Sequence, residues 1–140
     1  MISLQLVVDT NIVVSAALKP EGLQRFVLLA ATTKPASLFV SDDILREYEV
    51  VLHRPELRLR KGLRSRLLQF IKNNSRKVHP KNSIRAAIDP DDDKFLECAE
   101  AARADYLVTG NLRHFPRYWK GTKIVSSREF ADIVAPHQSL

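Results

Sequence analysis

Short apolar runs alternate along this chain with segments in which apolar residues recur at helical spacing. The runs at residues 4–8, 37–40, 106–109 and 124–125 are rich in branched side chains. Such runs are typical of buried parallel strands that lead into turns. A further short strand is predicted at residues 77–79. The first run matters most, because it stops at Asp9, and ligands of open α/β sheets bind beyond the carboxyl ends of the strands.

Helical spacing predicts six helices between and after these runs, at residues 11–17, 23–31, 41–52, 56–73, 89–102 and 126–134. Asn11 and Ser41 are the expected caps of the first and third helices. Ser126 and Glu129 form a capping box at the start of the last helix. Gly62 weakens the middle of the fourth helix by about 1 kcal/mol relative to alanine, so this element is expected either as one helix or as two pieces.

Strands that alternate with helices predict an α/β fold whose parallel sheet is covered on both sides. Repeats, low-complexity tracts and linkers are absent from the sequence, and residues 1–140 are therefore expected to form a single domain. A chain of this size buries roughly two thirds of its unfolded surface, which is enough for a core held by packing alone.

Cysteine content and hydropathy predict a soluble cytoplasmic protein with no membrane segment. Cys98 is the single cysteine, so no disulfide pair indicates an oxidising compartment. The N-terminus lacks the basic and apolar regions of a signal peptide. The longest apolar run, at residues 26–31, is too short to span a bilayer.

The formal net charge is +6, but the basic residues are distributed unevenly. Residues 54–85, here called the basic segment, contain eleven Lys or Arg and a single acid, Glu56, which leaves a net charge of −4 for the rest of the chain. Such asymmetry points to a polyanionic partner, with nucleic acid favoured over an anionic membrane surface. A solvated helix face would explain the segment equally well if it stood alone.

Three acidic positions are predicted to meet at one edge of the sheet. They are Asp9 after the first strand, Glu47 in the third helix and the cluster at residues 89–93, with Asn111 as a fourth polar candidate. Hard oxygen ligands without Cys or His suit Mg²⁺ or Mn²⁺ rather than zinc. Two carboxylates about 4 Å apart repel by roughly 4 kcal/mol at an effective dielectric of 20, and a divalent cation relieves that repulsion. A carboxylate-bound metal beside a basic surface suits the hydrolysis of a phosphodiester.

Each position also has a simpler interpretation. Asp9 could only cap the following helix, and acids at the start of the helix at 89–102 are favoured by its dipole. Glu47 could pair with a surface arginine, and Asn111 is a common turn residue. The joint placement of these residues, rather than any one of them, carries the prediction.

Four blocks of sequence together resemble the PIN domain family. They are residues 6–11 (LVVDTN), 40–48 (VSDDILREY), 89–96 (DPDDDKFL) and 107–111 (LVTGN), and the similarity extends from residue 4 to about residue 134. Their order and spacing are most similar to the branch of VapC-type toxins of toxin–antitoxin systems. The resemblance implies a Rossmann-like α/β/α sandwich and an endoribonuclease that depends on Mg²⁺ or Mn²⁺.

The resemblance also implies a set of site residues. Asp9 matches the first acidic ligand of the family, Glu47 the second and Asp93 the third, with Asp92 as a substitute because the acidic cluster allows a slip of one residue. Many members carry a fourth Asp where this chain has Asn111, so one tightly held ion is expected rather than two. Asn111 would orient a water or an outer ligand. An antitoxin protein is the implied partner, and a homodimer is common in the family.

Two further features of the sequence are candidate substrate contacts. Phe115, Tyr118 and Trp119 lie among Arg113, Arg117 and Lys120, an arrangement that could stack bases, although such aromatics more often cover the edge of a core. His114 is close enough to Asn111 to approach a phosphate, but a surface histidine is the simpler interpretation. The four histidines show no metal-ligand spacing.

Two other functions compete with a toxin ribonuclease. A domain that binds RNA or a partner without cleaving is favoured by Asn111 in place of an acid. A phosphatase that uses Asp9 as a covalent nucleophile, as in haloacid dehalogenase-like enzymes, would usually carry a second Asp two residues later, where this chain has Asn11.

Overall fold

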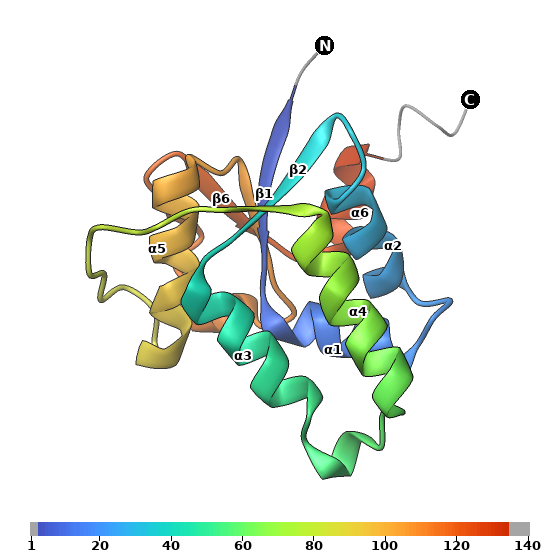
Figure 1. Ribbon diagram of the computed structural model, residues 1–140. Coiled ribbons are helices and arrows are strands. Elements are labelled where there is room, and N and C mark those ends of the chain that lie inside the picture. The colour runs from blue at the N-terminus through green and yellow to red at the C-terminus, as the bar shows by residue number, and fades with distance from the viewer. Residues whose placement is uncertain (1–2, 135–140) are drawn as a thin grey trace.

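A six-stranded sheet forms the centre of the fold in the computed structural model, which describes residues 3–134 (Figure 1). The strands are β1 (Leu4–Val8), β2 (Ala36–Val40), β3 (Ser75–Lys77), β4 (Tyr106–Val108), β5 (Tyr118–Trp119) and β6 (Thr122–Val125), in the spatial order β3-β2-β1-β4-β6-β5. All neighbours are parallel except β5, which pairs antiparallel with β6 at the sheet edge. The predicted α/β class is confirmed.

The helices are α1 (Thr10–Leu18), α2 (Leu23–Ala31), α3 (Asp42–Leu52), α4 (Lys61–Asn73), α5 (Asp93–Ala102) and α6 (Ser127–Val134). Helix α5 packs against β1, β2 and β4 on one face of the sheet. On the other face α2 packs against β2 and contacts both α1 and α6, so the sheet is the middle of three layers (Figure 1). Buried branched residues are concentrated in the strands β1, β2, β4 and β6, because both faces of these strands are covered.

Several predicted boundaries differ from the structure. The first helix begins at Thr10, and Asp9 rather than Asn11 is its N-cap. The segment predicted at 77–79 forms its strand two residues earlier, as β3. Strand β5 was not predicted, because two residues carry no readable alternation.

The predicted helix at 56–73 is divided before Gly62 rather than at it. A 3₁₀ turn occupies Pro55–Leu57, and α4 starts only at Lys61. Arg58 lies between them in the left-handed region, with a φ of 52°, which ends the turn and redirects the chain. Gly62 itself lies in the first turn of α4, where a glycine costs little.

The predicted capping box of α6 is present. The backbone N–H of Ser126 donates to Glu129 Oε1 at 2.9 Å, and the backbone N–H of Glu129 donates to Ser126 Oγ at 3.1 Å. In the described part of the chain, no helix has the length and apolar character needed to cross a membrane.

Candidate active site

Asp9 is held at the carboxyl end of β1 by the register of the sheet. Val8 of β1 lies opposite Val108 of β4, so the next residues, Asp9 and Thr109, are also neighbours. The Thr109 hydroxyl donates to Asp9 Oδ2 at 2.7 Å, and the backbone N–H of Thr10 donates to Asp9 Oδ1 at 2.7 Å. Asp9 therefore does cap α1, as the simpler interpretation suggested, but its second oxygen is directed to the neighbouring strand.

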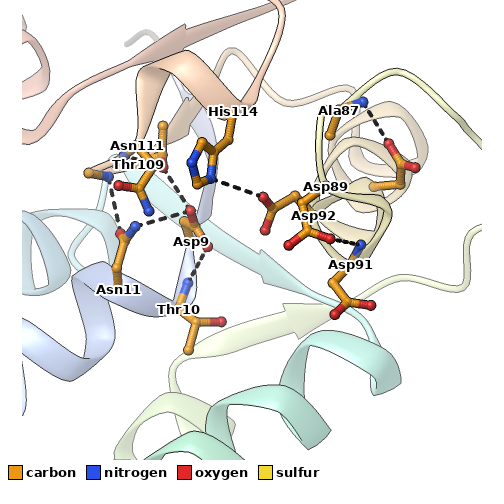
Figure 2. Close-up of polar contacts among 12 residues, drawn as sticks. Asp9, Thr10, Asn11, Ala87, Asp89, Asp91, Asp92, Thr109, Asn111 and His114 are labelled. Atoms are coloured by element: carbon orange, nitrogen blue, oxygen red, sulfur yellow. Dashed lines mark hydrogen bonds and ion pairs between the residues drawn. The ribbon is translucent and has the colours of Figure 1, made fainter.

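Asn11 fixes the same carboxylate from inside α1. Its amide nitrogen lies 3.3 Å from Asp9 Oδ2, and its Oδ1 accepts the backbone N–H of Gly110 at 3.1 Å (Figure 2). A Cβ atom at Gly110 would lie 3.3 Å from Asn11 Oδ1, so a larger residue there would press on Asn11. Asp9 is thus oriented by donors from the first turn of α1 and from Thr109, the residue that follows β4.

Glu47 reaches the same region because β2 ends level with β1. Ser41 follows β2 and accepts the backbone N–H of Ile44 at 3.3 Å, which starts α3 at this edge of the sheet. On the second turn of α3, Glu47 accepts a hydrogen bond from the Thr10 hydroxyl through Oε2. Its Oε1 lies 2.5 Å from the ammonium of Lys94.

Tyr48 ties α3 to the same strand end. Its side chain is completely buried, and its hydroxyl donates to the backbone carbonyl of Val8. Glu47 and Asp9 are therefore each adjacent in sequence to one partner of a buried hydrogen bond. This bond fixes the distance between the helix and the strand that carry the two acids.

The structure separates the two adjacent acids at the start of α5. Asp92 lines the pocket together with Asp9 and Glu47. Its Oδ2 is 3.5 Å from His114 Nδ1 (Figure 2). Asp93 does not line that pocket and is only 6% exposed.

The carboxylate of Asp93 is used by the preceding loop. Its Oδ1 accepts the backbone N–H groups of Ala86 and Ala87 at 3.0 and 2.8 Å, which holds the loop against α5. Of the two acids predicted for the third ligand position, Asp92 lines the pocket and Asp93 does not, and which of them binds a metal stays a prediction. The two neighbouring acids point to different sides because the 3₁₀ turn Pro90–Asp92 rotates successive side chains.

The acids surround a pocket of about 740 Å³ at the carboxyl ends of the strands. Seven carboxylates line it, and only three cationic side chains do. The carboxylates are Asp9, Asp43, Glu47, Glu56, Asp89, Asp91 and Asp92, and the cations are Arg46, Arg54 and Lys94. An acidic pocket in a chain of net charge +6 is a place where a cation is favoured.

Electrostatics within the pocket are consistent with that preference. The pKa of Asp9 is raised from 3.8 to about 6, and burial is the largest cause. The charges of Asp92 and Glu47 also raise this pKa, whereas the hydrogen bonds from Thr109 and Thr10 lower it. The pKa of Asp92 is also raised, first by burial and then by the charge of Asp89. The protein alone therefore does not compensate these carboxylates fully.

The donor set fits a hard divalent ion, although it is not arranged around one. Carboxylate and amide oxygens from Asp9, Glu47, Asp92 and Asn111 line the pocket, and these are ligands that Mg²⁺ and Mn²⁺ accept. Within residues 3–134, no three His, Cys, Asp or Glu side chains are gathered closely enough to hold a metal. Glu47 is instead directed to Lys94, and Asp92 to His114.

Sequence reasoning missed Lys94 and undervalued His114 and Thr109. The register of β1 and β4 could have indicated Thr109, because the residue after each strand occupies the same edge. Lys94 and His114 offered no comparable signal, since each contacts an acid that is distant in sequence.

The aromatic cluster lies elsewhere. Tyr118 is 62% exposed on the edge strand β5, and it does not line the pocket. Trp119 packs against the hydrophobic core, with the ammonium of Lys120 5.7 Å from its ring centroid. Base stacking by these residues stays a prediction, and the packing of Trp119 fits the core-edge interpretation.

Comparison with known proteins identifies the family. A family model described as PIN domain matches residues 5–113, and the chain belongs to this family. PIN domains are generally nucleases, and they generally use divalent metal ions.

Two relatives extend this result. The chain is 27% identical over 143 residues to uncharacterized protein MJ1680 of Methanocaldococcus jannaschii, a match that covers 94% of this chain and 92% of that protein. The fold of this chain is similar to that of a chain in the solved structure titled "Crystal structure of VapBC2 from Rickettsia felis bound to a DNA fragment from their promoter". That match has a TM-score of 0.62 at 16% identity and covers 88% of this chain and 98% of the other.

Proposed function

We propose that this protein is a metal-dependent endoribonuclease that hydrolyses RNA phosphodiester bonds as the toxin of a toxin–antitoxin system. The observation that carries the proposal is the acidic pocket, where Asp9, Glu47 and Asp92 arrive from three separate elements at the carboxyl end of the sheet. In a PIN domain this is the edge at which ligands of an α/β sheet are expected.

Asp9, Glu47 and Asp92 would hold one Mg²⁺ or Mn²⁺ ion. Such an ion, when bound, polarises a phosphoryl oxygen and lowers the pKa of a bound water. Asp93 is left out because its carboxylate serves the 86–87 backbone. Asn111 lines the pocket as a neutral residue, so the charge available there supports one tightly held ion rather than two.

The chain's own residues orient the groups around the reacting phosphate. Hydrogen bonds from Thr109, Asn11 and the Thr10 backbone hold both carboxylate oxygens of Asp9, so this side chain has a defined orientation. The backbone N–H of Asn111 donates to Thr109 Oγ1 at 3.0 Å, and Asn111 lines the pocket, which supports a role for its side chain in orienting a water. The attacking water gives up its proton to solvent or to a pocket carboxylate.

The basic segment would bind RNA through its phosphates. Among residues 3–134, Lys77 is the single member of the segment that forms an ion pair, with Asp42 at 2.9 Å. The other ten have no acidic partner in the described part of the chain, and Arg54 lies on the pocket rim. A surface of uncompensated cations gives salt-sensitive affinity that is largely independent of sequence.

We further propose an antitoxin protein as the partner, a homodimer as the assembly, and the cytoplasm as the location. The fold shared with a chain of a VapBC2 complex supports the antitoxin, together with the resemblance of the four sequence blocks. Residues 1–140 would form a single PIN-like domain, which the continuous core of the described residues supports. A growth arrest on expression that a neighbouring small gene relieves would support the toxin role, and unrestricted growth would contradict it.

Asp9→Asn tests the nuclease activity. The variant should lose Mn²⁺-dependent cleavage of single-stranded RNA, and unchanged cleavage would refute the proposed site.

A matched pair of variants, at Asp92 and at Asp93, tests which of these two acids is the metal ligand. Asp92→Asn should weaken Mn²⁺ binding in calorimetry at least about tenfold, which is about 1.4 kcal/mol. Asp93→Asn should leave binding within about twofold, because Asn keeps the Oδ1 acceptor. The opposite pattern would make Asp93 the ligand.

A second candidate function is RNA or partner binding without cleavage. Glu47 already has a cationic partner in Lys94, and Asn111 replaces an acid, so the pocket could persist without a metal. RNA binding that remains intact when the wild-type protein binds no Mn²⁺ at millimolar concentration would favour this candidate.

A further inference from the structure

Lys94 makes an unusual contact in the pocket. Its ammonium lies 2.5 Å from Glu47 Oε1, and the two side chains are only 22% and 23% exposed. Each of the other ion pairs in the described residues has at least one partner that is more than 40% exposed. Lys94 and Glu47 are also far apart in sequence, on α5 and α3.

Local structure does not favour a lysine at this place. Lys94 is the second residue of α5, where the helix dipole favours acids and disfavours cations. Partial burial of the ammonium adds a desolvation cost that an ion pair often fails to recover. A long, flexible lysine side chain could reach solvent instead, so its inward position calls for a task in the pocket.

We propose that Lys94 positions the scissile phosphate of the RNA, and that it is the internal counter-ion of Glu47 before metal and substrate bind. This inference rests on the proposed function. In it the ammonium leaves Glu47 when that carboxylate becomes a metal ligand, and donates to a non-bridging phosphate oxygen. The Lys94 ammonium thereby exchanges the Glu47 carboxylate for the RNA phosphate as its anionic partner.

Two features support the exchange. Lys94 borders both the acidic pocket and an adjacent pocket lined by Asp43 and residues of the 83–97 segment, so its side chain has space on either side. An ammonium has three N–H donors, and within residues 3–134 the Lys94 ammonium makes a hydrogen bond to Glu47 alone. Donors therefore remain for a phosphate.

Lys94→Gln should have two effects of opposite direction. Mn²⁺ affinity of the RNA-free protein, measured by calorimetry, should rise about tenfold, because the competing cation on Glu47 is removed. RNA affinity in Ca²⁺, measured by anisotropy with a labelled single strand, should fall. The slope of log K against log salt should become shallower by about 0.7, which is the value for one lost phosphate contact on a single strand.

Three variants make the test specific. Lys94→Arg keeps the charge, so both measurements should return toward the wild-type values. Lys19→Gln removes one exposed cation just after α1, outside the pocket, and should change neither the Mn²⁺ affinity nor the salt slope. If Lys94→Gln does not fold, Lys94→Met fills a similar volume without charge and carries the same expectations.

Each outcome is decisive. Mn²⁺ affinity that falls or stays within about twofold in the uncharged variants would overturn the counter-ion role. An unchanged salt slope would overturn the phosphate contact. A wild-type protein that binds no Mn²⁺ or cleaves no RNA refutes the proposed function itself and this inference with it, whereas a normal wild type beside unaffected variants refutes only the role of Lys94.

Discussion

Asp9→Asn should stabilise the metal-free protein at neutral pH, because the wild-type carboxylate is ionised in a poorly hydrated place. Asp9 is 5% exposed, and its burial raises its pKa from 3.8 to about 6. At 1.36 kcal/mol for each pKa unit, the ionised form costs the fold about 3 kcal/mol. Asparagine has nearly the same shape and no charge, so it removes this cost.

Hydrogen bonds reduce the expected gain. The Asn oxygen can still accept from the Thr10 backbone, and the Thr109 hydroxyl can turn to accept from the new amide. The amide nitrogen of Asn11, however, would then face the amide nitrogen of the new side chain, whereas in the wild type it faces Asp9 Oδ2, which is an acceptor. We therefore expect a net gain of about 1 to 2 kcal/mol in the free energy of unfolding at pH 8.

The gain should depend on pH in a defined direction. Between about pH 4 and pH 6 the unfolded chain has lost the Asp9 proton while the folded protein keeps it, so raising the pH favours unfolding of the wild type. Above pH 6 the cost is fully present, and below pH 4 it is absent. The advantage of the variant should therefore be largest above pH 6 and disappear toward pH 4.

Urea denaturation in a chelator, followed by circular dichroism at several pH values, measures this difference. Addition of Mn²⁺ should then raise the stability of the wild type and not that of Asp9→Asn. A variant that is less stable than the wild type at pH 8, or a difference that is constant from pH 4 to pH 8, would refute the assignment of the cost to the buried charge.

Three further predictions concern the framework around the site. Tyr48→Phe removes the buried hydrogen bond to the Val8 carbonyl and should lower the free energy of unfolding in urea by about 1 to 3 kcal/mol. Weaker Mn²⁺ binding would show that α3 has moved. Unchanged stability would contradict this role of Tyr48. Cys98 is buried and its pKa is raised to about 12, so Ellman's reagent should react with the native thiol far more slowly than with the unfolded one, and equal rates would show an open core. Ser126→Ala breaks the capping box with Glu129 and should lower stability by about 1 kcal/mol in thermal unfolding, whereas Ser65→Ala on the exposed face of α4 should have little effect.

Strand and helix order could be predicted from the sequence because both depend on local periodicity. The buried strands β1, β2, β4 and β6 each contain a short apolar run, and the capping box of α6 is specified by residues three positions apart. Strand β5 lacked such a signal. It has only two residues, and the turn that precedes β6 brings them into antiparallel pairing with that strand. The cap of α1 was misplaced because Asp9 and Asn11 are both good caps, and only the backbone geometry selects between them.

The sequence by itself determined which elements carry Asp9, Glu47 and the acidic cluster, because each lies beside a recognisable strand end or helix start. Tertiary structure alone decided that Asp92 rather than Asp93 faces the pocket, that Thr109 orients Asp9, and that Lys94 neutralises Glu47. The physical reason is that a 3₁₀ turn sets side-chain direction residue by residue, and that contacts between distant residues depend on sheet register and helix packing, which no local pattern encodes.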